Sequence, residues 1–497
     1  MAIDVAEHQA ADTPPGAPAA TTPPAVPVAA RHGRWVGVLV PLLLVLVAGA
    51  LRFWDLDHPG RIYFDETYYA NDAEAMLRRG VEEDFAVHPP LGKWLIAAGI
   101  AAAGFDTLGW RLASAAAGTV TVLVTYLLGL RLFRRRGVAA LAAFLLSIDG
   151  LAFTMSRIAM LDAILAMFVA LGAWFLVLDR DRLWTALPTD LEPEDPGRRS
   201  LPLRWRGFRW LAGLAFGAAL ATKWSAVLAI GVAGLYLAAS ELLWRRRVTG
   251  SPWTRLWPAV GAGVVALVVL PAVVYVSSYG AWFANFANTR PGAQLCDASG
   301  CDVSLPQVVR AWWGEQREIA RFHAELEAEH RYRAAAWTWP VLGRPVAYYY
   351  ESCTDEEQAE GDCVVAPGNV GEILGLGNPA IWWSALLLCY PLVLWGMIRR
   401  EWPAWTIGAF LFGQTLPWLA APRTVFLFYA TPAVPFLCLG LAYGATRVAS
   451  VRALRWVPLT VAVLAVAAFL FWHPLYVGTQ ISRAAWWLRI WIRPGWI

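Results

Sequence analysis

Long apolar runs alternate with short polar segments along the chain from about residue 35 onward. Each run approaches the roughly 20 residues that a helix needs to cross a bilayer. Since helices satisfy all their backbone hydrogen bonds inside lipid, we predict an all-α polytopic membrane protein with one bundle. We place about eleven spans at 35–54, 110–132, 138–155, 158–178, two short ones within 210–244, 256–277, 379–398, 402–420, 424–445 and 455–472.

Arginine clusters indicate how the spans are oriented. All of them fall on one side of the predicted topology, and cytoplasmic loops carry an excess of Lys and Arg. The N-terminus is therefore expected in the cytoplasm, and the first long loop, 55–109, outside. The clusters are Arg134–Arg136, the seven Arg within 179–209, Arg245–Arg247, Arg399–Arg400, and Arg447 with Arg452 and Arg455.

The segments between the spans divide the chain into parts. Residues 1–33 are rich in Ala, Pro and Thr and are expected to form a disordered cytoplasmic tail. In the first outer loop, Thr67 to Arg79 has helical composition, and Leu91 to Gly104 reads as interfacial or re-entrant. The remaining parts are a transmembrane module 34–277, an extracytoplasmic loop 278–378, C-terminal transmembrane helices 379–472, and a Trp-rich interfacial tail 473–497.

Composition excludes some partners. The chain is 58% hydrophobic and 16% charged, with a net charge of only +4, so its arginines report orientation and no nucleic-acid partner is expected. Cys389 and Cys438 lie inside apolar runs and are expected to be core residues. Four further cysteines share the loop 278–378, which favours disulfides on the oxidising side of a membrane. Three pairings are open, and our choice joins neighbours: Cys296 with Cys301, and Cys353 with Cys363.

Ionisable residues from separate segments gather at the predicted outer face. Charges at membrane depth are costly and usually face a cavity or one another. Cations can hold the phosphate of an anionic lipid-linked donor, and an acid can take a proton from an acceptor hydroxyl. The residues are Asp65, Glu66, His88, Lys93, Arg111, Arg157, Asp162, Lys223 and Arg423.

Several of these residues also have structural interpretations. Asp65 and Glu66 suit the N-terminus of the helix that follows them. His88 and the two prolines after it form a rigid turn, and Lys223 can reach a lipid headgroup.

Another set is open to structural interpretation as well. Arg157 and Asp162 are candidates for an ion pair, although five residues is a poor spacing on a helix. Arg423 suits a topology anchor. His323 and His330 are seven residues apart, so a solvated helix is favoured over a metal site, and we expect no metal.

Seven motifs in order carry a resemblance. They are FDE at 64–66, HPPLGK at 88–93, WRL at 110–112, SRIAMLD at 156–162, ATKWS at 221–225, GRPVAYYYES at 343–352 and WLRIW at 487–491. Over about 35–497 the chain resembles the protein O-mannosyltransferases, and among them the actinobacterial-like members. The resemblance implies a GT-C-type membrane glycosyltransferase with eleven spans. It also implies transfer of mannose from a polyprenyl phosphate to Ser or Thr of an exported protein.

The resemblance also implies roles for residues. Asp65 is similar to the catalytic acid-base of the first outer loop, with Glu66 as its partner. Arg52, Arg111 and Lys223 match positions that the family needs, Lys223 near the donor phosphate. For the donor site we add His88, Lys93, Arg157, Asp162 and Arg423, and for the acceptor loop Arg344, Tyr349 and Glu351. The loop 278–378 is too short for the β-trefoil domain of eukaryotic relatives.

These observations lead to a hypothesis of single displacement with inversion. Asp65 takes the proton of the acceptor hydroxyl, and Lys223 with an Arg meets the charge of the leaving phosphate. No cofactor is needed. The expected partners are polyprenyl-phosphate-mannose, Ser/Thr-containing exported proteins, membrane lipids and the secretion translocon, at the plasma membrane with an extracytoplasmic site.

Two alternatives stay open. One is a GT-C glycosyltransferase with a lipid or glycan acceptor. The other is a lipid-linked sugar flippase, which is disfavoured because the polar residues gather at one side and do not line a path through the membrane.

Overall fold

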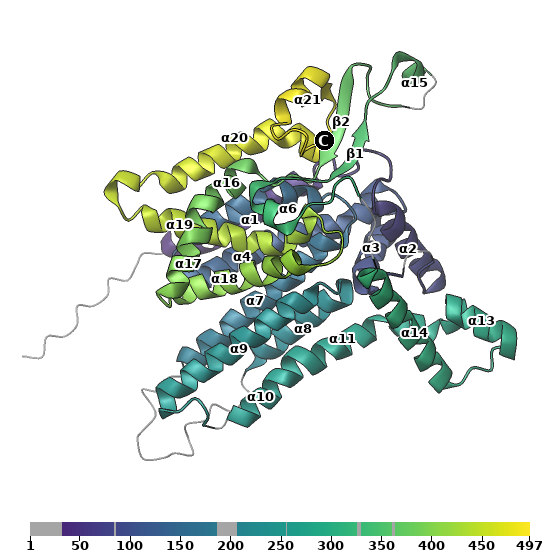
Figure 1. The fold of residues 1–497 in the computed structure, drawn as a ribbon, viewed down its shortest axis with the longest axis horizontal. Helices are drawn as coiled ribbons and strands as arrows, with labels where there is room; N and C mark the ends of the chain where they lie inside the picture. The colour runs from purple at the N-terminus through teal and green to yellow at the C-terminus, as the bar shows by residue number, and fades with distance from the viewer. Residues whose placement is uncertain (1–31, 84–85, 186–205, 255, 326–329, 360–362) are drawn as a thin grey trace, which may run out of the picture.

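The computed structural model describes residues 32–83, 86–185, 206–254, 256–325, 330–359 and 363–497. The predicted tail 1–33 therefore lies almost wholly outside the described residues, as does most of the predicted cytoplasmic loop 179–209. The described residues form one α-helical bundle with a small β-sheet and short helices at one end (Figure 1).

Seven of the predicted spans are long and apolar enough to cross a membrane. The structure therefore confirms the prediction of a multi-pass membrane protein that was made from the apolar runs. The seven are α4 (Thr107–Phe133), α7 (Leu161–Thr185), α9 (Ala226–Thr249), α10 (Leu256–Val264) continued through η2 (Val265–Val269) to α11 (Leu270–Ser278), α16 (Pro379–Leu388) with α17 (Tyr390–Ile398), η6 (Leu427–Ala433) with α19 (Val434–Val448), and η7 (Arg452–Leu454) with α20 (Val457–Val477).

The other four predicted spans are also helical but shorter or interrupted. They are α1 (His32–Phe53), α5 (Arg136–Ser147) followed by α6 (Gly150–Met155), α8 (Gly207–Thr222), and α18 (Trp402–Thr415) followed by η5 (Leu416–Ala420).

Prolines account for several of the interruptions. A proline lacks the backbone N–H that a helix interior needs, so helices restart at it. Pro271 follows the π-helical turn η2, and Pro391 stands at the start of α17, shortly after α16 has ended.

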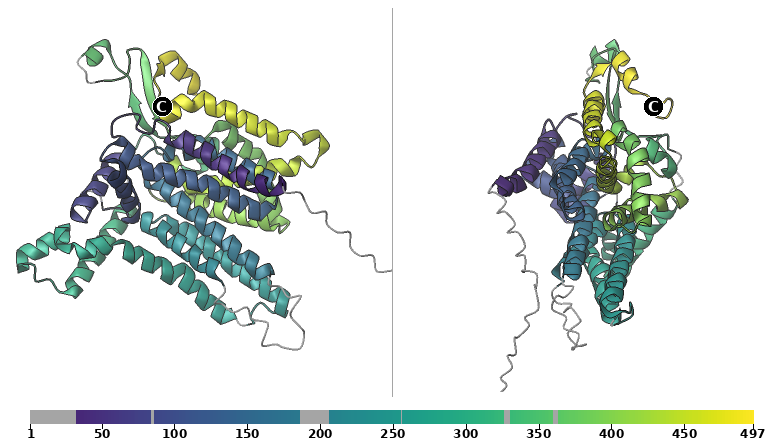
Figure 2. Two further views of the ribbon diagram at one scale, coloured as in Figure 1. Left: turned by 180° about the vertical axis from the view of Figure 1, so that it is seen from behind. Right: turned by 90° about the vertical axis from the view of Figure 1, so that its left-hand side faces the viewer.

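The interior of the bundle is built around α4, α7 and α19. Helix α7 packs against α4 and α8, and α19 packs against α5, α16 and α18. Helices α20 and α10–α11 lie along opposite edges and are mostly exposed (Figures 1 and 2), as expected for helices that face lipid.

One end of the bundle, here called the loop end, carries most of the non-spanning elements (Figure 1). The predicted helix at 67–79 is α2 (Glu66–Arg79), and the apolar stretch after it is α3 (Leu91–Ala103), which packs on α2, α4 and α8. The smaller elements are α12 (Gly280–Ala284), η3 (Phe286–Asn288), α13 (Arg290–Ser299), α14 (Leu305–Ala324), η4 (Ala336–Val341) and α15 (Asp355–Ala359).

A three-stranded antiparallel sheet completes the loop end. Its order is β1 (Ala347–Glu351), β2 (Asn369–Leu374) and β3 (Ile481–Ser482). Helix α21 (Arg483–Arg489) follows β3, so the C-terminal segment folds onto the long loop 278–378.

Two tryptophans of the predicted interfacial tail 473–497 pack inside the protein near this sheet. Trp486 and Trp496 are buried, and their indole N–H groups donate to the Glu372 carboxylate and the Leu342 carbonyl. Trp487 and Trp491 are exposed. Buried indoles usually find such partners, so Trp486 and Trp496 contribute to the fold, and the interfacial position of the tail stays a prediction.

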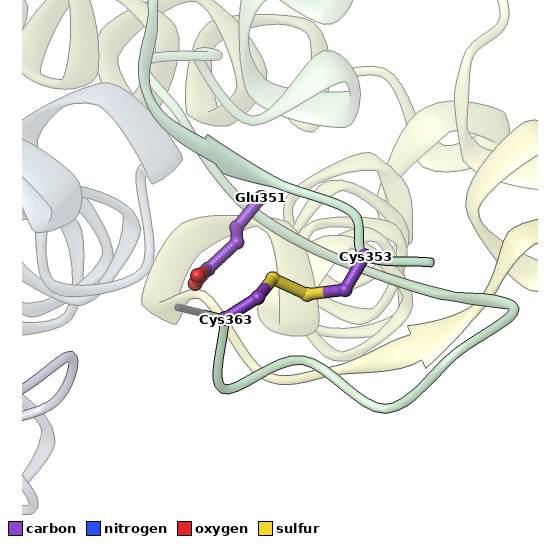
Figure 3. Close-up of side chains that lie close together, drawn as sticks. All are labelled: Glu351, Cys353 and Cys363. Carbon is purple, nitrogen blue, oxygen red and sulfur yellow. A yellow bond between two sulfur atoms is a disulfide. The ribbon is translucent and has the colours of Figure 1, made fainter. Parts of the chain in front are cut away.

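The four loop cysteines are joined as neighbours, the pairing chosen from the sequence. Cys296–Cys301 closes the end of α13, and Cys353–Cys363 closes the connection between β1 and β2 (Figure 3). Cys389 and Cys438 are buried free thiols among apolar helices, as expected.

Candidate active site

Asp65 stands at the start of α2, directly after a sharp turn of the chain. Phe64 has a φ of +53°, a left-handed conformation that is uncommon for a bulky residue. Asp65 occupies the N-cap position, but its side chain makes no capping hydrogen bond. The structural interpretation of Asp65 as a helix cap is therefore not supported, and its carboxylate is available for other chemistry.

Glu66 is held rigidly by Arg111 of α4. Both side chains are fully buried, and Arg111 donates from Nε and Nη2 to the two carboxylate oxygens at 2.8 and 3.0 Å. The Ala159 N–H donates to Glu66 Oε1 at 3.0 Å. The other N–H groups of Arg111 reach the carbonyls of Leu56, Pro59 and Arg61. A guanidinium has five N–H donors, and all five are used inside the protein, which supports a positioning role for Arg111.

Lys223 and Asp162 form a second buried ion pair next to Asp65. Lys223 Nζ lies 2.9 and 2.8 Å from the two carboxylate oxygens of Asp162. Burial raises the pKa of Asp65 to about 6; the Lys223 charge opposes this rise and the Asp162 charge adds to it. Asp65 thus lies between two ion pairs. The Glu66–Arg111 pair adjoins it along the chain, and the Lys223–Asp162 pair lies beside its carboxyl group.

Aromatic rings lie beside Lys223. Its Nζ lies 5.2 Å from the ring centre of Tyr429 and 5.6 Å from that of Phe428, close enough for cation–π contact.

A further polar cluster contains His88, His323 and Arg423. His323 donates from Nε2 to the Val87 carbonyl at 2.9 Å, so its Nδ1 accepts from Arg423 Nη1 at 3.0 Å. Arg423 also donates to the Tyr429 hydroxyl at 2.8 Å. The rings of His88 and His323 stack with centres 5.1 Å apart.

The two histidines are neutral at physiological pH. Burial lowers the pKa of His323 to about 4, with the Arg423 and Lys223 charges adding to the fall. Burial also lowers the pKa of His88, helped by the Lys223 charge. Arg423 is therefore the charged member of this cluster, and the Lys223 charge lies close to it.

Arg157 does not pair with Asp162, as one interpretation of the sequence had it. It donates to the carbonyls of Leu51, Arg52, Trp54 and Asp55 at the end of α1. The last carbonyls of a helix have no helical partner, and a guanidinium fork satisfies them here. Arg157 thereby fixes the entry to the loop that contains Asp65.

Two other predicted donor contacts, Arg52 and Lys93, are engaged with groups of the protein itself. Arg52 is buried in α1, where it donates to the carbonyls of Ala48 and Ser147. Lys93 is buried and lies 2.9 Å from both the Asp72 and the Glu82 carboxylates. A cation already matched by two acids is a poor phosphate ligand, so the geometry favours a structural role for Lys93.

The acceptor-loop candidates lie on and around β1. Tyr349 packs against Tyr63, with ring centres 5.8 Å apart, and donates to Glu351. Glu351 forms an ion pair with Arg61 at 3.1 Å. Arg344 binds the carbonyls of Arg331 and Pro494 and so ties the long loop to the C-terminus.

Glu351, Cys353 and Cys363 come close enough to suggest a metal centre (Figure 3). The two cysteines share a disulfide, however, so neither offers the thiolate that a metal binds. The geometry of this group gives no support for a metal ion.

An apolar cavity of about 250 Å³ lies between α16, α18 and α19. Leu411, Phe412 and Val434 are among its lining residues, and none of its lining side chains is charged. The candidate active site is therefore defined by its charged groups and not by this cavity.

Sequence reasoning missed His323 and Tyr429. The sequence favoured a solvated helix for His323, yet it is partly buried at the end of α14 and holds Arg423. Its only sequence signal is its place at the end of an amphipathic helix in the loop 278–378. Tyr429 carries no signal that separates it from neighbouring aromatic residues.

Comparison with known protein families gives two matches. Residues 105–284 match the family described as dolichyl-phosphate-mannose-protein mannosyltransferase. Residues 308–496 match the C-terminal four-transmembrane region of protein O-mannosyltransferase.

Curated relatives match over nearly the whole chain. A polyprenol-phosphate-mannose–protein mannosyltransferase of Mycobacterium tuberculosis is 33% identical, covering 93% of this chain and 92% of the relative. Proteins of the same name are 30% identical in Mycolicibacterium smegmatis, covering 93% of each chain, and 31% identical in Corynebacterium glutamicum, covering 88% of each.

Solved structures share the fold. The S. cerevisiae protein O-mannosyltransferase Pmt1-Pmt2 complex bound to the sugar donor has a TM-score of 0.73 at 14% identity, covering 92% of both chains. ArnT from Cupriavidus metallidurans bound to undecaprenyl phosphate has a TM-score of 0.55 at 16% identity, covering 90% of this chain and 77% of that one. The fold is that of the GT-C glycosyltransferases.

Proposed function

Because the chain belongs to the protein O-mannosyltransferase family, we propose that it transfers mannose from a polyprenyl-phosphate-mannose to Ser or Thr hydroxyls of proteins. Relatives that match almost its full length carry this activity in their names. The observation that carries the proposal is the convergence at Asp65, where the Glu66–Arg111 and Lys223–Asp162 ion pairs meet from four separate segments.

Asp65 is the general base of the proposed reaction. The acceptor oxygen attacks the anomeric carbon and forms the new glycosidic bond, while the bond from that carbon to the phosphate oxygen breaks. Asp65 takes the hydroxyl proton, and the electron pair of the broken bond leaves on the polyprenyl phosphate. Burial raises the pKa of Asp65 to about 6, which makes its carboxylate a stronger base that is still mostly ionised near neutral pH.

Lys223 and Arg423 meet the charge of the leaving phosphate. Both lie next to Tyr429, so their cationic groups face a common region. A cation that is already in place where charge develops stabilises the transition state without reorganisation. Phosphate is a good leaving group, so the scheme needs no second acid, no metal and no cofactor.

The Glu66–Arg111 pair positions the base. It links α2 to α4 and, through the Ala159 N–H, to the turn before α7. Asp65 is covalently adjacent, so this network fixes its carboxylate relative to Lys223 with the precision that catalysis needs.

The reaction is proposed for the outer face of the plasma membrane. Helix α9 starts next to Lys223 at the loop end and finishes near Arg245–Arg247 at the other end. Since arginine-rich ends are cytoplasmic, the site opens on the outer leaflet. Exported proteins that emerge unfolded from the secretion translocon are the proposed acceptors at that face.

Purified protein incubated with polyprenyl-phosphate-mannose and a Ser/Thr peptide tests the proposal, with mass spectrometry as the readout. A hexose on Ser or Thr is expected. Parallel reactions with lipid and glycan acceptors serve as the comparison, and transfer to these alone would contradict the assignment. Movement of donor across vesicles without any transfer would contradict it as well.

A further inference from the structure

Helix α14 presents three different surfaces along its 20 residues. One surface packs into the structure: Gln316 and Ile319 are buried, and Val308 and Trp312 cover a small cluster of aromatic residues. The helix is therefore held firmly on one side, and its other two surfaces are exposed.

The second surface is an exposed apolar stripe. Leu305, Val309 and Trp313 are spaced four residues apart, so they lie along one face of the helix. They are 74%, 49% and 54% exposed. Single exposed apolar residues are common, but three in a row on one face of a fixed helix mark an interaction surface.

The third surface is basic and borders the stripe. Arg310, Arg317 and Arg321 are all exposed, and their spacing of seven and four residues places them on one side of the apolar stripe. The acids lie elsewhere: Glu315 accepts from the Trp282 indole, and Glu318 is on the side opposite the stripe.

The position of α14 decides what this surface meets. Helices α13 and α14 project from the loop end beyond α11 in Figure 1 and, seen from behind, in the left view of Figure 2. Helix α11 ends a spanning segment that is largely exposed, with Val268, Val273 and Val276 uncovered. In a membrane this valine face contacts acyl chains, so α14 lies above the same patch of lipid.

We propose that α14 lies on the bilayer surface at the loop end, with a lipid membrane as its partner. Leu305, Val309 and Trp313 enter the boundary between headgroups and acyl chains, and the three arginines bind lipid phosphates. Apolar residues beside a basic stripe are the pattern of helices that lie in this interface. The contact is continuous with the lipid-facing surface of α11.

This contact has a consequence for the candidate site. His323 lies at the end of α14 and holds Arg423 through Nδ1. A membrane-anchored α14 thus holds His323 at a fixed position relative to Arg423 and the bundle. This position is next to the leaflet that contains the lipid-linked donor of the proposed function.

Spin labels at two matched positions test the proposal in lipid nanodiscs. V309C places a label in the apolar stripe, and E318C places one on the opposite side of the same helix. The native cysteines do not interfere, since four are in disulfides and two are buried. Collision with oxygen, which partitions into lipid, is compared with collision with a water-soluble nickel complex.

A several-fold higher oxygen-to-nickel ratio is expected for V309C than for E318C. Equal ratios would overturn the proposal, and so would a V309C label shielded from both reagents, which would indicate a second protein on this face. In discs with anionic lipid, replacing the three arginines by Gln is expected to lower the V309C ratio. An unchanged V309C ratio would show that the three arginines do not contribute to the proposed contact. The readout does not depend on mannosyl transfer, so it succeeds or fails separately from the proposed function.

Discussion

Replacement of Glu66 by Gln tests whether a buried ion pair holds the base in place. The substitution keeps the shape of the side chain but removes its charge, and its amide NH₂ then faces an Arg111 N–H. Arg111 would keep its three bonds to carbonyls and lose one charge-assisted bond. Such a bond contributes about 1.5–3 kcal/mol, and breaking a buried pair costs about 3–5 kcal/mol. We expect a loss of stability of about 3 kcal/mol, between these limits.

Glu83→Gln is the matched control for Glu66→Gln. Glu83 pairs with Arg79, but the two side chains are 54% and 46% exposed, so the same substitution should cost less than about 1 kcal/mol. Thermal unfolding in detergent compares the two variants with the parent. The double variant Glu66→Gln, Arg111→Gln should lose less stability than the two single variants summed, because the partners share one interaction. Equal unfolding midpoints for Glu66→Gln and Glu83→Gln would refute the reasoning.

Three further predictions concern the candidate site. Because burial raises the pKa of Asp65 from 3.8 to about 6 and the base must be ionised, the transfer rate should rise with pH through about 6 and then level off; a rate profile that is flat between pH 5 and 8 would contradict this role. The folded protein binds this proton more tightly than the unfolded protein, so the contribution of Asp65 to the free energy of unfolding should fall as pH rises from 3.8 to about 6. Lys223→Gln removes a charge that lowers the pKa of Asp65, so the acid limb of the rate profile should move to higher pH. An unmoved limb would show that the Lys223 charge does not act on the group that titrates. His323→Asn keeps a hydrogen-bond acceptor near the position of Nδ1 for Arg423, whereas His323→Gln keeps only a donor that reaches the Val87 carbonyl. The Gln variant should therefore show the higher KM for the donor substrate, and equal KM values would show that His323 does not position Arg423.

The apolar runs were enough to predict the bundle because a spanning helix depends on length and hydropathy alone. The eleven runs all fold as helices, and helix α2 appears where its composition indicated. The contacts of the tail were not predictable, since the sequence shows that tryptophans are amphipathic but not that Glu372 and Leu342 accept hydrogen bonds from two of them.

The candidate site was predictable in its location but not in its pairings. Charge and topology brought Asp65, Arg111 and Lys223 to one end of the bundle. Which cation meets which acid depends on side-chain reach across helices that are far apart in sequence. Lys223 therefore pairs with Asp162, and Arg157 instead satisfies the open carbonyls at the end of α1.

The most direct test of the central claim is mannosyl transfer by Asp65→Asn, measured together with donor binding. Asn keeps the size of the side chain but cannot take up the hydroxyl proton. Purified variant should bind polyprenyl-phosphate-mannose as the parent does, and transfer to a Ser/Thr peptide should fall by about 100-fold or more. Transfer at near the parental rate, with binding intact, would show that the proton goes elsewhere and that Asp65 is not the base.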